Sequence, residues 1–166
     1  MLREWFSLCV LVLSCILVAG FAYGDDIKKH ASCKYCGMDR EKFGHARMLI
    51  EYDDGTTEGT CSVHCAAVDL SLNVDKTPKA IWVGDFNTKK LIDAENAQWV
   101  IVDGKPGVMT QRAKWAFTSK EDAEAYIKQN GGKHASFDEV MKTAYEDMFK
   151  DTKMIREKRK MKRMSQ

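Results

Sequence analysis

Four cysteines in this chain have the types and spacing of a metal site. Cys33 and Cys36 are separated by two residues, and Cys61 and Cys65 by three. If a helix begins near residue 62, Cys61, His64 and Cys65 share one of its faces, with Cβ atoms about 5–6 Å apart. The pattern C-x2-C-x24-C-x3-C predicts a zinc-type site, in which His64 can replace one cysteine.

Two methionines favour a softer metal than zinc. Met38 comes two residues after Cys36, and Met109 follows the Gly107-Val108 turn. Zinc makes little use of a thioether, whereas thiolate and thioether ligands together select Cu(I). The residues alone therefore leave Cu(I) and zinc as alternative ions.

Two uses of the cysteines without metal also stay open. Under oxidising conditions four cysteines form two disulfides in one of three pairings, although such short loops gain little stability. Cys33-Lys34-Tyr35-Cys36 also resembles a glutaredoxin-type dithiol, which would make the protein a thiol-disulfide oxidoreductase. Redox dithiols usually open a helix, and Gly37 disfavours a helix start here.

The first residues predict export. Arg3 precedes an apolar run over residues 6–23, and small residues stand before Asp25 where signal peptidase would cut. Residues 1–24 are therefore predicted to be a Sec-type signal peptide of a periplasmic protein, with an uncleaved membrane anchor as the alternative.

The charge is distributed unevenly. The net charge is +2, yet residues 149–166 carry eight Lys and Arg against two acidic residues. A mildly acidic body with a basic tail argues against a nucleic-acid binder. The tail, which also contains Met154, Met161 and Met164, is interpreted as an arm for an anionic membrane surface or acidic partner, a strip that hands over metal, or a solvated helix end.

Hydrophobic patterning predicts two strand–turn–strand–helix units, over residues 45–73 and 97–130. Expected strands cover residues 45–52, 56–61, 80–86, 97–102 and 114–118, and expected helices begin at the capping residues Ser62, Ser119 and Ser136. This predicts an α+β domain over residues 25–148, with an antiparallel sheet and helices packed on one face. In the first unit, the hairpin should bring the two cysteine pairs together.

The residues around Cys36 resemble the NosL family of nitrous oxide reductase accessory proteins. Cys36-Gly37-Met38 looks like the family's Cys-x-Met motif, and Met109 falls where the family has a methionine. Further similar segments follow in order within residues 32–140: Asp53-Asp54-Gly55, Trp82–Phe86, Ile92-Asp93-Ala94, Ala97, Trp99-Val100, Phe117-Thr118-Ser119, Ala123, Ala125-Tyr126 and Gly131-Gly132.

That resemblance implies a periplasmic copper chaperone and not an enzyme. It implies that Cys36, Met38 and Met109 bind Cu(I), which passes to an apo copper enzyme such as nitrous oxide reductase or to a membrane copper-delivery complex. Two features depart from the family: no convincing lipoprotein acylation site, and a site made richer in thiols by Cys33, Cys61 and Cys65, with His64 beside them. A zinc-stapled interaction domain is the alternative.

Overall fold

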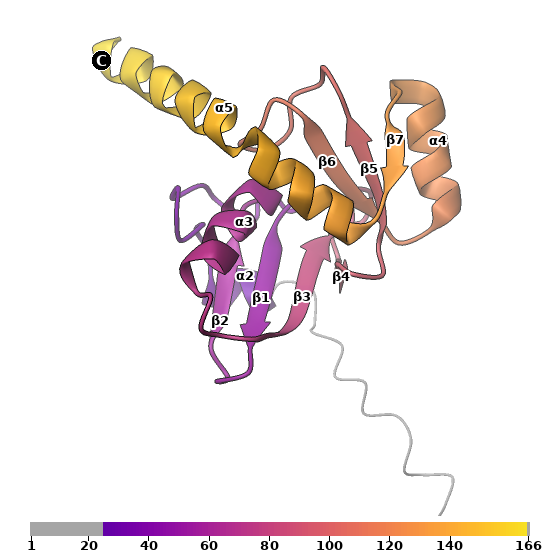
Figure 1. Cartoon of the computed structure of the whole chain (residues 1–166), viewed down its shortest axis with the longest axis horizontal. Helices are drawn as coiled ribbons and strands as arrows, with labels where there is room; N and C mark the ends of the chain where they lie inside the picture. The colour runs from indigo at the N-terminus through magenta and orange to yellow at the C-terminus, as the bar shows by residue number, and fades with distance from the viewer. Residues whose placement is uncertain (1–24, 166) are drawn as a thin grey trace, which may run out of the picture.

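The structure, a computed structural model, describes residues 25–165, so the expected signal peptide lies outside the described residues. Strands form two antiparallel sheets, of order β2-β1-β3-β4 and β6-β5-β7 (Figure 1). The strands are β1 (Met48–Tyr52), β2 (Thr57–Thr60), β3 (Pro78–Gly84), β4 (Leu91–Asp93), β5 (Gln98–Val102), β6 (Ala113–Phe117) and β7 (Lys133–Ala135). The helices are α2 (Asp25–Lys29), α3 (Val63–Leu72), α4 (Lys120–Asn130) and α5 (Phe137–Met164).

The first sheet is built around the hairpin of β1 and β2. A turn at residues 53–55 closes it, with Gly55 at φ 80°, a conformation that side chains with a Cβ rarely adopt. Met48 at the start of β1 pairs with Thr60 at the end of β2. Segments before β1 and after β2 therefore meet at one end of the sheet, as the sequence predicts.

The second sheet repeats this arrangement. β5 and β6 pair antiparallel, and α4 follows β6. The Ser119 side chain accepts a hydrogen bond from the backbone N–H of Asp122, which caps α4. β7 then adds to β5 as an edge strand.

Backbone contacts and α5 join the two sheets. Beyond β3, the Phe86 N–H donates to the carbonyl of Ala116, 2.8 Å away, and the Asp85 carboxylate accepts from the Thr118 N–H at 2.8 Å. α5 runs across both sheets and then extends past them to the C-terminus (Figure 1). Its residues Val140 and Ala144 share a core with β1, β3, β5 and α3.

The predicted α+β class, with antiparallel pairing, is confirmed, and both predicted units are present. Sequence patterning missed β4 and β7, which are three residues long and contain no fully buried side chain to give a periodic signal. β3 begins at Pro78, two residues before the strand expected from residue 80, because proline is tolerated as the first residue of a strand. α5 continues without interruption through the domain boundary expected after residue 148. Between residues 25 and 165, no helix is long and apolar enough to cross a membrane.

Candidate metal centre

The first cysteine pair lies in a tight turn, the knuckle, defined here as residues 32–39. The Cys33 N–H donates to the Met38 carbonyl and the Gly37 N–H donates to the Cys33 carbonyl, both at 2.8 Å. Gly37 has φ 72°, which only glycine adopts without strain. Because the pair lies in a turn rather than at a helix start, it lacks the feature that usually activates a redox dithiol.

The two residues between these cysteines anchor the knuckle. The Tyr35 hydroxyl donates to the Asp69 carboxylate of α3, which also accepts from the Tyr52 hydroxyl at 2.5 Å. The Lys34 N–H donates to the Gly59 carbonyl of β2 at 3.3 Å. The Lys-Tyr pair that resembles a glutaredoxin motif therefore fixes the knuckle against β2 and α3.

The four thiols converge on one point. All four Sγ atoms lie within 4.8 Å of one another, with Cys36 and Cys61 3.4 Å apart and Cys61 and Cys65 3.8 Å apart. A tetrahedral ion with metal–sulfur bonds of about 2.3 Å places its sulfurs about 3.8 Å apart. The cluster of these four thiols, which we call the thiol group, therefore fits a single soft ion. All four are free thiols, and no disulfide pairs them.

Contacts among the thiols shift their pKa values in opposite directions. Hydrogen bonds from Cys36, Cys61 and Cys65 lower the pKa of Cys33, whereas contact with Cys33 raises the pKa values of Cys61 and Cys65. For Cys36, contact with Cys33 raises the pKa, but the contacts with Cys61 and Cys65 prevail and bring the pKa to about 7. Four adjacent thiols cannot all ionise without a compensating cation, because like charges oppose one another. A bound metal ion supplies that charge.

The helix that carries Cys65 begins beside the thiols. Ser62 occupies the N-cap position of α3, yet its side chain makes no capping hydrogen bond, and no acidic residue lies in the first turn. The positive end of the helix dipole is therefore left to stabilise negative charge on neighbouring sulfur.

Cys36 is the most accessible thiol of the group, although Cys65 also reaches the wall of the hollow beside it. Cys33, Cys61 and Cys65 are at most 2% exposed, whereas Cys36 is half-buried. Cys36 lines a hollow of about 260 Å³ together with Met109 of the 107–110 turn and Ile155 of α5. We call this the Cys36 hollow.

Both methionines expected at the site lie near the thiols. Met38 and Met109 are half-buried and pack against the core cluster that contains Cys33, Cys61 and Cys65. Met109 has φ 63°, an uncommon conformation for a residue with a side chain, which costs about 1–3 kcal/mol. Glycine would adopt this φ without strain, so the presence of Met109 at this position indicates a functional role for its thioether.

His64 lies outside the thiol group. It is 6% exposed, and its Nδ1 lies 3.7 Å from the Asp151 carboxylate of α5 and makes no hydrogen bond among the described residues. Burial lowers the pKa of His64, which outweighs the nearby charge of Asp151. The structure therefore places His64 between α3 and α5, in the wall of the Cys36 hollow, and its predicted role as a ligand or an orienting residue stays a prediction.

Sequence reasoning missed the residues that hold the knuckle in place. Arg40 is fully buried, and its guanidinium donates to the Thr60 and Met48 carbonyls at 3.1 and 2.9 Å. Asp26 accepts from both Arg40 and Arg47 at 2.9 Å. In the sequence, Asp26 and Arg40 lie among other charges and resemble a solvated surface, so no local signal marks them.

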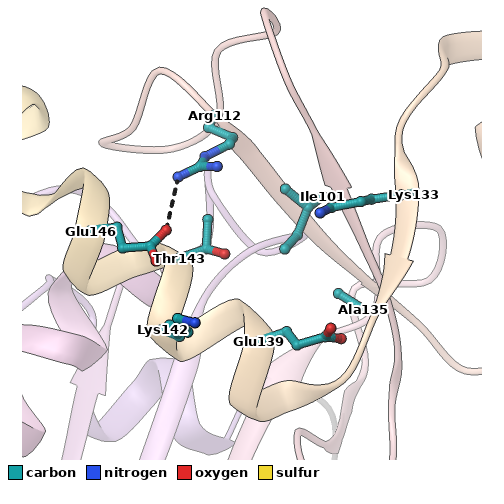
Figure 2. Close-up of a pocket in the computed structure, with 8 residues that line it drawn as sticks. All are labelled: Ile101, Arg112, Lys133, Ala135, Glu139, Lys142, Thr143 and Glu146. Carbon is teal, nitrogen blue, oxygen red and sulfur yellow. Dashed lines mark ion pairs between the residues drawn. The ribbon is translucent and has the colours of Figure 1, made fainter.

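A separate hollow of about 200 Å³ lies between the first turns of α5 and the second sheet (Figure 2). Arg112 there pairs with Glu146 at 3.6 Å and with Asp147 at 2.6 Å. The hollow contains no sulfur and mixes charges of both signs, so we assign it no role in metal binding. Its lining residues are Ile101, Arg112, Lys133, Ala135, Glu139, Lys142, Thr143 and Glu146.

Comparison with known proteins decides the family. The NosL family model matches residues 25–145. This chain belongs to the NosL family. The crystal structure of the copper chaperone NosL from Shewanella denitrificans is similar, with a TM-score of 0.52 and 25% identity over 65% of this chain and 87% of that one. No curated protein matches the sequence.

Membership of the NosL family confirms that the protein is not an enzyme and agrees with the predicted α+β fold. The thiol group can hold a metal ion, and it contains all four cysteines of the described residues. Which residues ligate an ion stays a prediction.

Proposed function

We propose that this NosL-family protein is an exported, periplasmic carrier that binds Cu(I) and delivers it for maturation of a copper enzyme such as nitrous oxide reductase. One observation carries the proposal: a half-exposed thiol, Cys36, belongs to a group of four thiols within 4.8 Å and lines a hollow with Met109. The similarity to a copper chaperone supports the choice of cargo.

Delivery proceeds by ligand exchange. Copper binding requires thiolate, and the pKa of about 7 at Cys36 makes proton loss easy near neutral pH. A thiol, thioether or imidazole of the partner enters at the accessible side of the ion while Cys36 or Met109 leaves. Cysteine and methionine favour Cu(I) because both are soft ligands.

The partner is an apo copper enzyme or a membrane copper-delivery complex. From residue 153 onwards, α5 carries a run of cations opposed in that stretch only by Glu157: Lys153, Arg156, Lys158, Arg159, Lys160, Lys162 and Arg163. Two of these cations, Arg156 and Arg159, line the Cys36 hollow. An acidic partner surface, or an anionic membrane face near the delivery complex, would be attracted to the same side as the exposed thiol.

A zinc-stapled interaction domain is the second candidate. Three of the thiols are almost completely buried, and closed sites with four thiolates are typical of structural zinc. In that case the metal would stabilise the fold and would not leave.

Metal content and Cu(I) affinity distinguish the two. We expect protein purified without oxidation to take up Cu(I) tightly against a chelator of known affinity, and Cys36→Ser or Met38→Leu to weaken uptake while the fold persists. Met161→Leu, an exposed position of α5, is the matched control and should change nothing. Stoichiometric zinc that Cu(I) does not displace, with Met38→Leu silent and Cys36→Ser unfolded, would exclude the carrier and establish structural zinc.

A further inference from the structure

Three methionines from separate segments line a hollow of about 300 Å³ under α5. Met38 belongs to the knuckle, Met109 to the 107–110 turn and Met154 to α5. All three are half-buried. Further along the same helix, Met161 and Met164 are 62% and 76% exposed. Met154 therefore differs from the other methionines of the tail in lining, with Met38 and Met109, one hollow, which we call the methionine hollow.

The methionine hollow adjoins the Cys36 hollow. Met109, Ile155 and Arg159 line both, so one wall is shared. The Arg159 guanidinium also donates to the Cys36 carbonyl at 3.1 Å, which ties α5 to the knuckle. An ion in the methionine hollow is therefore next to the accessible thiol of the thiol group.

We propose that α5 completes a second sulfur site, in which Met154 joins Met38 and Met109 to hold Cu(I) beside the thiol group. The inference rests on the proposed function, because it adds a station for the same cargo. Thioethers are soft ligands that select Cu(I), and they need not lose a proton to bind. Residue 154 lies beyond the region that the family model matches, residues 25–145, so Met154 is supplied by the C-terminal extension of this chain.

The charges around the methionine hollow suit a transient binding site for copper. Lys158 and Arg159 also line it, and their positive charge opposes a cation held by neutral thioethers. Thiolates a short distance away carry negative charge and attract the same cation. Copper therefore binds more weakly among the methionines than in the thiol group, and α5 lies where copper enters or leaves.

Methyl resonances of the methionines provide a direct test that does not depend on delivery. The purified protein, labelled with ¹³C at its methionine methyl groups, is titrated anaerobically with Ag(I), a redox-inert soft monovalent ion. Met38 and Met109 also belong to the ligand set proposed with Cys36, so the decisive resonance is that of Met154: we expect it to shift, with those of Met38 and Met109, once Ag(I) exceeds what the thiol group holds. Those of Met161 and Met164 should stay in place.

Substitution gives the second readout. Met154 is proposed as a ligand of this site, and even outer-shell partners of metal ligands change affinity by about 10- to 100-fold, so Met154→Leu should weaken the later Cu(I) equivalent by at least about tenfold. Met161→Leu, in the same helix and exposed, should match the unaltered protein.

The outcomes separate this inference from the proposed function. If Met38 and Met109 shift while Met154 does not, or if Met154→Leu binds like Met161→Leu, Met154 only packs and the second site is wrong. If no methionine shifts although the thiols take up Cu(I), the methionine site falls together with Met38 and Met109 as copper ligands, and only binding by the thiol group stands. If the protein takes up neither Ag(I) nor Cu(I), both proposals are overturned.

Discussion

The two strand–turn–strand–helix units have the same topology but use their helix N-termini differently. In the second unit, Ser119 caps α4 with its side chain, and Glu121 and Asp122 add negative charge in the first turn. In the first unit, Ser62 makes no side-chain cap, no acidic residue follows, and Cys61 and Cys65 flank the start of α3. The N-terminus of α4 is capped by a side chain of its own unit, whereas the N-terminus of α3 has no side-chain cap and lies beside the thiol group.

The difference teaches that the helix without a side-chain cap is the one beside the four thiols. The helix dipole at the start of α3 favours thiolate, and so favours a cation among the sulfurs. The second unit has local capping of its helix, whereas the first has buried ion pairs, to which the proposed metal would add. Four predictions test this contrast.

Cys65→Ser should have the largest effect. It removes one buried thiol from the group, so bound metal no longer stabilises the folded state fully, and a loss of about 5 kcal/mol or more is expected. Ala123→Ser in the first turn of α4, where Ala123 is fully buried, is the matched control. Chemical unfolding with and without a chelator measures both. If the chelator fails to remove the difference between Cys65→Ser and the unaltered protein, the contrast is wrong.

Asp26→Asn should cost about 3–5 kcal/mol, because it leaves the guanidinium groups of Arg40 and Arg47 buried without their carboxylate. The Asp26 side chain is 1% exposed, so water cannot replace the pairing. Urea unfolding measures the loss. Asp25→Asn next to it, whose side chain is 54% exposed, should stay within about 0.5 kcal/mol of the unaltered protein. Equal effects of the two substitutions would exclude this anchor of the knuckle.

Acid should lower the stability of the folded protein, because Asp26 becomes protonated. Burial raises the pKa of Asp26, but hydrogen bonding and charge from Arg47 and Arg40 outweigh it and hold the pKa below the ordinary 3.8. The unfolded chain therefore takes up a proton at higher pH than the folded one, so stability falls as pH drops below about 3.8 towards the folded pKa. Unfolding midpoints at pH 5 and pH 3 test this. Asp26→Asn should show a smaller change over that range, and an unchanged slope would contradict the assignment.

The smallest effects come from the caps themselves. Ser119→Ala should cost about 1 kcal/mol, because it removes an N-cap acceptor. Ser62→Ala should cost less than about 0.5 kcal/mol in metal-free protein, since no cap bond is lost. Thermal unfolding of both variants measures the difference, and a larger loss from Ser62→Ala would show that α3 is capped after all.

Much of the fold was predictable because its signals are local. Ser119 with Asp122, Ser136 with Glu139, and the Asp53-Asp54-Gly55 turn mark element ends through chemistry within four residues. β4 and β7 were not predictable, since each is short and held by its neighbour in the sheet rather than by its own pattern.

For the site, the sequence by itself predicted the candidate sulfur ligands and the meeting of the two cysteine pairs, and the structure confirms that the four thiols meet. Spacing supplied the two cysteine pairs, and a hairpin between them had to return the chain to its starting end. Only the tertiary structure decided that Arg40 and Asp26 fix the knuckle, that His64 faces Asp151, and that Met154 reaches the hollow of Met38 and Met109. These contacts join residues far apart in the chain. They depend on how α5 and α2 pack, and no local pattern of residues encodes that packing.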